Sequence, residues 1–122
     1  MNNLKKVLFS CLFLFFILCG CGNKEGDLIS YMKAKELIIN ENAILLDVRT
    51  EDEYNDNHIN GAINLDVSKI DDSSASEIID SLDKTVIVYC KSGVRSKQAK
   101  DKLEELGYSN VYDLGSISNW EE

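Results

Sequence analysis

The 122-residue chain contains no proline, one histidine and one tryptophan. Without proline, the ends of helices and strands must be marked by glycines and by capping residues. A zinc site needs three or four suitable ligands, so a single histidine, His58, argues against a metal centre. We therefore expect neither a metal nor a cofactor.

Positive charge is also scarce, with 13 lysines and arginines against 21 aspartates and glutamates. All of the acidic residues and 11 of the basic ones lie beyond position 20, which gives that part of the chain a formal charge of −10. Such a protein is repelled by phosphate groups, so we expect no nucleic-acid partner. Attachment to a membrane would have to depend on a lipid rather than on charge.

The first twenty residues have the layout of a secretory signal peptide. Lys5 and Lys6 precede a largely apolar run over residues 7–18. That run is too short to span a bilayer, which takes about 20 residues. The stretch Leu18–Cys21 resembles the bacterial lipobox, whose cysteine becomes the lipidated N-terminus after cleavage, and we identify Cys21 as that cysteine.

These features predict a lipoprotein signal peptide over residues 1–20, a lipid-anchored tether over 21–27 and one folded domain over 28–122. The expected location is extracytoplasmic, with the protein anchored by its lipid to the bacterial cell membrane. The alternative is an ordinary signal peptide that leaves Cys21 as a free thiol. In the lipidated form Cys90 is the one remaining thiol, which excludes a disulfide within the chain.

Within the domain, short apolar runs alternate with helical patterns. The predicted strands cover residues 43–46, 62–65, 86–89 and 111–114. Helix starts are indicated by Ser30 as an N-cap and by two capping boxes, Thr50 with Glu53 and Ser74 with Glu77. Strands that are apolar throughout and alternate with helices predict a small α/β fold, in which helices flank both faces of a mostly parallel sheet.

The segment from Thr85 to Ser96 predicts a buried strand that stops at Cys90, a tight loop and the start of a helix. Unpaired N–H groups and the positive end of the helix dipole would favour the thiolate of Cys90 over its thiol. This hypothesis requires that the amides converge on the sulfur and that solvent can reach it. The residues expected to bind the substrate are Lys91, Ser92, Gly93, Val94, Arg95 and Ser96, with positive charge from Lys91 and Arg95.

Several separated segments together resemble the rhodanese, or thiosulfate sulfurtransferase, domain in its single-domain form. They are Leu46-Asp47-Val48-Arg49 with Glu53-Tyr54, residues 58–64, residues 88–96, Leu106-Gly107-Tyr108, Asp113-Leu114-Gly115 and Trp120. The resemblance implies that Cys90 accepts a sulfane sulfur from a small anionic donor such as thiosulfate and becomes a persulfide. The outer sulfur would then pass to cyanide or to a thiol.

Asp47 and Arg49 match the family at the end of the first strand. We expect them to support the site through structural ion pairs, with Arg49 bonded to Glu53 or to another carboxylate of the short helix. Arg49 could also flank the mouth of the pocket. Many relatives have arginine directly after the cysteine, where this chain has Lys91, so a point charge replaces a guanidinium fork.

Other readings of Cys90 stay open. The same loop would serve a persulfide carrier that hands sulfur to a protein partner, or a cysteine-dependent phosphatase or arsenate reductase. Four residues separate Cys90 from Arg95, whereas phosphatases generally have five, and a shorter loop gives a ring of donors too narrow for phosphate. Cys90 could also be a structural residue packed at a strand end. A protease-like pair would have to use His58, for which we prefer the role of a turn residue.

Overall fold

Strands and helices alternate along residues 27–121, the part of the chain that the computed structural model describes. The elements are α2 (Tyr31–Glu41), β1 (Ile44–Asp47), α3 (Glu51–Asp56), β2 (Ile63–Asn64), the 3-10 helix η1 (Val67–Lys69), α4 (Asp72–Ile78), β3 (Val86–Cys90), α5 (Val94–Glu105), β4 (Val111–Ser116) and the 3-10 helix η2 (Ile117–Asn119). The predicted signal peptide, Cys21 and nearly all of the predicted tether lie outside the described residues.

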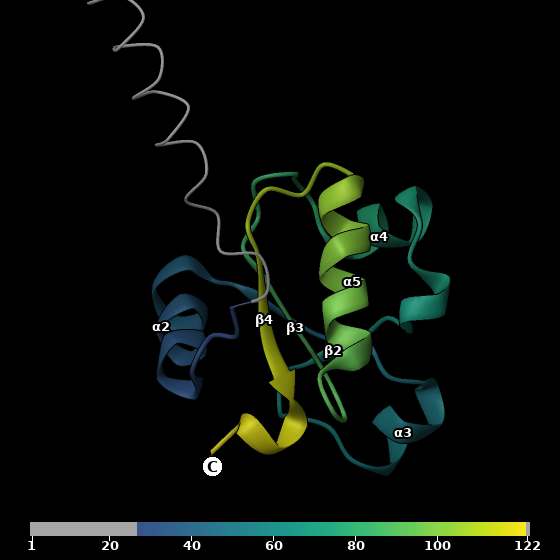
Figure 1. Ribbon diagram of the computed structural model, residues 1–122. Helices are drawn as coiled ribbons and strands as arrows, with labels where there is room; N and C mark the ends of the chain where they lie inside the picture. The colour runs from purple at the N-terminus through teal and green to yellow at the C-terminus, as the bar shows by residue number, and fades with distance from the viewer. Residues whose placement is uncertain (1–26, 122) are drawn as a thin grey trace, which may run out of the picture.

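The four strands form one parallel sheet in the order β2-β1-β3-β4. Helix α2 packs on one face of the sheet, while α4 and α5 pack on the other (Figure 1). The predicted α/β fold, with a mostly parallel sheet flanked by helices on both faces, is therefore confirmed. No helix within residues 27–121 is both long and apolar enough to cross a membrane.

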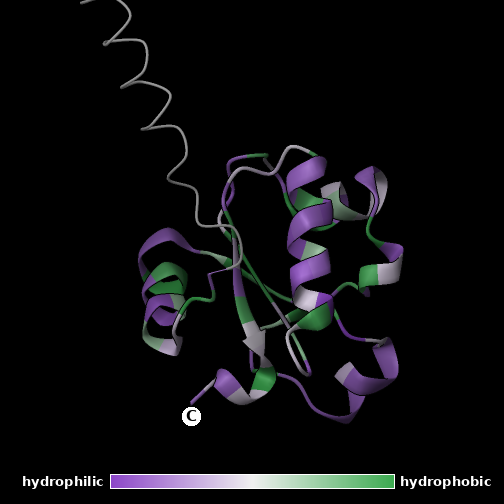
Figure 2. Ribbon diagram, viewed as in Figure 1, coloured by the Kyte–Doolittle hydropathy of each residue, from purple (hydrophilic) through white to green (hydrophobic). Residues whose placement is uncertain are grey.

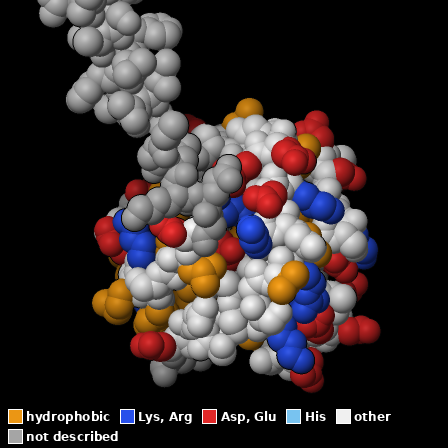
Figure 3. Space-filling view, viewed as in Figure 1, with side chains coloured by type: hydrophobic (Ala, Val, Ile, Leu, Met, Phe, Trp, Pro, Cys, Tyr) orange, Lys and Arg blue, Asp and Glu red, His pale blue; other side chains and the backbone are white. Residues whose placement is uncertain are grey.

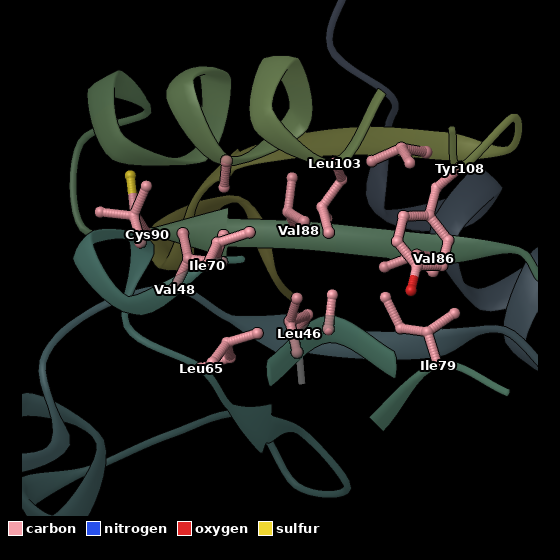
Figure 4. Packing of buried hydrophobic residues seen from close by; sticks show 14 residues of the cluster. Leu46, Val48, Leu65, Ile70, Ile79, Val86, Val88, Cys90, Leu103 and Tyr108 are labelled. Carbon is pink, nitrogen blue, oxygen red and sulfur yellow. The ribbon is translucent and has the colours of Figure 1, made fainter. Parts of the chain in front are cut away.

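The core consists of two clusters because side chains of a strand point alternately to opposite faces. Along β3, Val88 and Cys90 face α5, whereas Ile87 and Tyr89 face α2. All four are buried. Figure 2 shows the apolar strands between helices whose outer sides are hydrophilic, and Figure 4 shows Cys90 at the end of the row of buried side chains along β3. Cys90 is thus held by the α5 side of the core.

The helix ends follow the capping chemistry of the sequence at three places. The Ser30 hydroxyl accepts from the Lys33 N–H at 3.1 Å, and Thr50 and Glu53 form a reciprocal capping box. Helix α5 ends in a Schellman motif, in which the N–H of Tyr108 donates to the Leu103 carbonyl at 3.1 Å. Its left-handed residue is Gly107, with φ of 102°.

The predicted capping box of Ser74 with Glu77 is wrong. Helix α4 begins earlier, at Asp72, and its N-cap is Asp71. The Asp71 carboxylate accepts from the Ser74 N–H at 2.8 Å, and the Ser74 hydroxyl accepts from the Asp71 N–H at 2.9 Å. Ser74 is therefore the third residue of the helix, because the upstream aspartate competes successfully for the capping position.

Candidate active site

Cys90 is the last residue of β3, and residues 91–93 form a short loop that leads into α5. The carboxyl ends of parallel strands meet at one edge of a sheet, where ligands of α/β proteins commonly bind. Gly93 has a φ of 94° in the left-handed region, which lets the chain turn directly from the strand into the helix. A Cβ at Gly93 would lie 3.7 Å from the Cα of Gly115 in β4. The loop is therefore tight and rests on the last strand.

The loop aims hydrogen-bond donors at the Cys90 sulfur. The Gly93 N–H donates to Sγ at 3.0 Å, and Figure 4 shows the sulfur pointing toward the start of α5. Burial raises the pKa of the thiol, but the N–H groups of Ser96, Gly93 and Ser92 together bring it below its ordinary value. The arrangement favours the thiolate, as the sequence predicted.

The expectation that solvent can reach the Cys90 sulfur is wrong for this conformation. Cys90 is 1% exposed, whereas Lys91 and Ser92 of the loop and Val94 at the start of α5 are exposed. The side chain points into the α5 side of the core and the loop closes beside it, so the sulfur is not open to solvent in this conformation. A reagent would reach the sulfur only after a movement of the loop.

Burial alone would suit a structural cysteine. A cysteine that serves only as a small hydrophobe, however, has no need of hydrogen-bond donors around its sulfur. The Gly93 N–H at 3.0 Å from Sγ and the lowered pKa of Cys90 favour a thiolate instead. The geometry therefore supports a nucleophile more than a packing residue.

Two hydroxyl groups hold the loop in place. Ser116 of β4 donates to the Lys91 carbonyl at 2.6 Å, and Ser96 donates to the Gly93 carbonyl at 3.1 Å. These bonds fix the backbone on both sides of Ser92, so the N–H groups keep their direction without a ligand. Ser116 was not singled out from the sequence, because nothing in its local pattern indicates a partner 25 residues away.

We predict that Ser96→Ala moves the pH midpoint for alkylation of Cys90 by iodoacetamide to higher pH. The Ser96 hydroxyl holds the Gly93 carbonyl, and through it the loop that directs the Gly93 N–H at Sγ. Without this bond the thiolate, which is the form that reacts, is stabilised less. The measurement is the alkylation rate as a function of pH. Ser76→Ala on α4, whose hydroxyl bonds only to the Ser73 carbonyl, is the matched control and should leave the midpoint unchanged. An unchanged midpoint in Ser96→Ala would show that Ser96 does not help to lower the pKa of Cys90.

Arg95 lies in the first turn of α5 and pairs with a carboxylate from another element. Its two terminal nitrogens donate to the two Glu53 oxygens at 2.6 and 3.0 Å, with both side chains about 30% exposed. Glu53 also completes the capping box of α3, and mainly because of its bonds to Arg95 its pKa is lowered to about 2. The Glu53 carboxylate is therefore charged and bonded to Arg95 at every physiological pH.

Asp47 and Arg49 form a buried pair with each other. The guanidinium donates to both Asp47 oxygens, at 2.7 Å in the shortest contact, and to the Asn57 carbonyl at 2.6 Å. The structural role expected for the two residues is confirmed, but the expected pairing of Arg49 with Glu53 is wrong. Arg49 is 4% exposed and does not flank a pocket mouth, because Asp47, two residues earlier, presents a carboxylate inside the fold.

His58 and Trp120 have structural surroundings. The His58 ring hydrogen-bonds through Nδ1 to the Tyr54 carbonyl at 2.8 Å and stacks on the Tyr54 ring with centroids 3.8 Å apart. This matches the preferred role as a turn residue. Trp120 packs edge-on against Tyr31 of α2 at 4.9 Å, next to the core cluster on that face.

Several known proteins with similar sequences and folds are rhodaneses or sulfurtransferases. The sequence pattern of the rhodanese-like domain matches residues 30–122. The thiosulfate sulfurtransferase PspE of Escherichia coli K12 is 38% identical over 74 residues, which cover 61% of this chain and 70% of PspE. The thiosulfate sulfurtransferase GlpE of Coxiella burnetii is 35% identical over 93 residues, which cover 75% of this chain and 84% of GlpE.

Comparison with solved structures points to the same family. A solved structure described as a rhodanese with anions from E. coli matches with a TM-score of 0.60 and 32% identity, covering 63% of this chain and 89% of that one. The family match spans all four strands and the loop after Cys90. The chain therefore belongs to the rhodanese-like domain family and is an enzyme of the rhodanese type.

Proposed function

We propose that this protein moves a sulfane sulfur from a donor such as thiosulfate to cyanide or a thiol through a persulfide on Cys90. The thiolate attacks the outer sulfur of thiosulfate, the S–S bond of the donor breaks, and sulfite leaves with the electron pair. Cyanide then attacks the outer sulfur of the persulfide, which yields thiocyanate and restores the thiolate. Both steps conserve atoms and charge, and neither needs a general base.

The observation that carries the proposal is the set of donors directed at Sγ, with the Gly93 N–H at 3.0 Å. Such donors favour an anion on the sulfur, and a terminal persulfide anion has the same requirement. The E. coli rhodanese that resembles this chain was solved with anions. Lys91, an exposed residue of the loop, adds a positive charge for the approach of an anionic donor.

Two rival functions use the same thiolate. A phosphatase or arsenate reductase would need to fit a tetrahedral anion into a loop with four residues between Cys90 and Arg95, which favours sulfur transfer. A carrier would load one sulfur but would not turn over.

The deciding assay on the lipid-free domain measures thiocyanate formation and aryl phosphate hydrolysis side by side. We expect many thiocyanate molecules per Cys90 and no hydrolysis. Loading without turnover supports the carrier, and hydrolysis lost in Cys90→Ser without any sulfur transfer supports the phosphatase.

We also propose that the mature protein is anchored outside the cytoplasm through a lipid on Cys21. The support is the sequence of residues 1–21, with its lysines, apolar run and lipobox-like end. The test is fractionation of cells that express the full chain or Cys21→Ser. The full chain should be found with the membrane and carry a lipid mass on Cys21, and the variant should lose both. A wild-type protein without lipid would contradict this proposal and leave the sulfur-transfer proposal intact.

A further inference from the structure

Arg95, in the first turn of the helix that follows the active-site loop, is already bonded to a carboxylate. Arg95 donates two hydrogen bonds to Glu53 from α3, and its charge also interacts with those of the Cys90 thiolate and of Asp66, the N-cap of η1. The charge of Arg95 is therefore largely balanced by carboxylates and is not free for an anionic donor. In the view of Figure 3, acidic side chains are interspersed with the basic ones rather than gathered apart from them.

This arrangement weakens the attraction for a donor with two negative charges. A free guanidinium near the sulfur would stabilise thiosulfate about twice as strongly as a donor with one charge, because Coulomb energy scales with the product of the charges. The Glu53 carboxylate cancels most of that stabilisation. What remains for the donor is the ring of N–H groups, which suits a single terminal sulfur, and the charge of Lys91.

We infer that Glu53 is a specificity-determining residue that disfavours multiply charged donors, so that the site is suited to a donor with one negative charge or none, such as an organic thiosulfonate or a persulfide. The inference rests on the proposed sulfur transfer and names the class of its donor. With a thiosulfonate, the Cys90 thiolate takes the outer sulfur, the S–S bond of the donor breaks, and a sulfinate leaves with the electron pair. With a persulfide, the leaving group is a thiolate.

The variant that tests this is Glu53→Gln. Glutamine also serves at the third position of a capping box, so α3 keeps its start while the charge of Arg95 is no longer balanced by the Glu53 carboxylate. Asp52→Asn is the matched control, because it removes the same charge one residue away on α3 from an exposed side chain. At an ionic strength near 0.01 M, where the screening length is about 30 Å, the charge effect is at its largest.

We expect Glu53→Gln to lower the KM for thiosulfate by about three- to ten-fold and the KM for methanethiosulfonate by less, with kcat nearly unchanged. Asp52→Asn should leave both values close to those of the wild type, because surface charges without a close partner have small effects. A KM for thiosulfate that rises or stays the same in Glu53→Gln would overturn the inference. A rise would mean that Glu53 holds Arg95 in place for the donor.

A binding measurement separates this inference from the proposed function. Thiosulfate is titrated into Cys90→Ala and into Cys90→Ala with Glu53→Gln, and binding is followed by the amide NMR signals of the loop. The double variant should bind three- to ten-fold more tightly by the same charge argument, roughly as the KM changes. If the wild type forms no thiocyanate from either donor, the proposed function fails, while this titration still decides the role of Glu53. Equal or weaker binding of thiosulfate by the double variant would show that Glu53 does not disfavour a donor with two charges.

Discussion

Replacing Cys90 with serine is expected to reduce sulfur transfer by about three orders of magnitude or more, because the proposed nucleophile and persulfide carrier is lost. Serine is close to cysteine in size, and its hydroxyl can accept the Gly93 N–H that now donates to Sγ. The loop should therefore keep its shape. The measurement is steady-state formation of thiocyanate from thiosulfate and cyanide.

Loss of activity through misfolding must be excluded for this variant. Cys90 is buried in the α5 side of the core, so its thermal unfolding should be compared with that of the wild type. A midpoint close to that of the wild type, together with lost transfer, places the chemistry on Cys90. Transfer that persists in a folded Cys90→Ser protein would show that another group accepts the sulfur.

Asp47→Ala is expected to destabilise the protein by about 3–5 kcal/mol, the largest effect on folding that we predict. The variant leaves the Arg49 guanidinium buried without its carboxylate, and both side chains are at most 5% exposed. A change of this size is a large part of the stability of a small domain. Urea denaturation should show a much lower midpoint with a similar dependence on denaturant.

Two further variants make this prediction specific to a buried pair. Glu104→Ala breaks the surface ion pair of Lys100 with Glu104, in which the Glu104 side chain is 48% exposed. It should lower the free energy of unfolding by less than about 1 kcal/mol. Combining Asp47→Ala with Arg49→Met removes both charges and should recover much of the lost stability. A double variant as unstable as Asp47→Ala alone would show that the loss comes from packing rather than from the unpaired charge.

The fold could be predicted because its signals are local. The apolar strands and the caps at Ser30 and Thr50 depend on residues within one turn of each other, and each occurs where the sequence indicates. The Schellman end of α5 at Gly107 is of the same kind. The error at α4 is local too, because Asp71 and Ser74 are both good N-caps and the sequence alone does not rank them.

The details of the site depend on contacts between distant segments. Arg95 and Glu53 are 42 residues apart, and Glu53 was already explained by its capping box, so the pair had no sequence signal. The pairing of Arg49 with Asp47 depends on how the chain leaves β1, which spacing does not fix. The 1% exposure of Cys90 likewise follows from how α5 and the loop pack against β3.

We propose that the Gly93 N–H and its neighbours lower the pKa of Cys90 enough for its thiolate to accept a sulfur atom despite its burial. The most direct measurement is the mass of the intact lipid-free domain after treatment with thiosulfate at neutral pH. We predict an added mass of one sulfur, located on Cys90 and removed by cyanide. An unchanged mass with both thiosulfate and an organic thiosulfonate would contradict the claim.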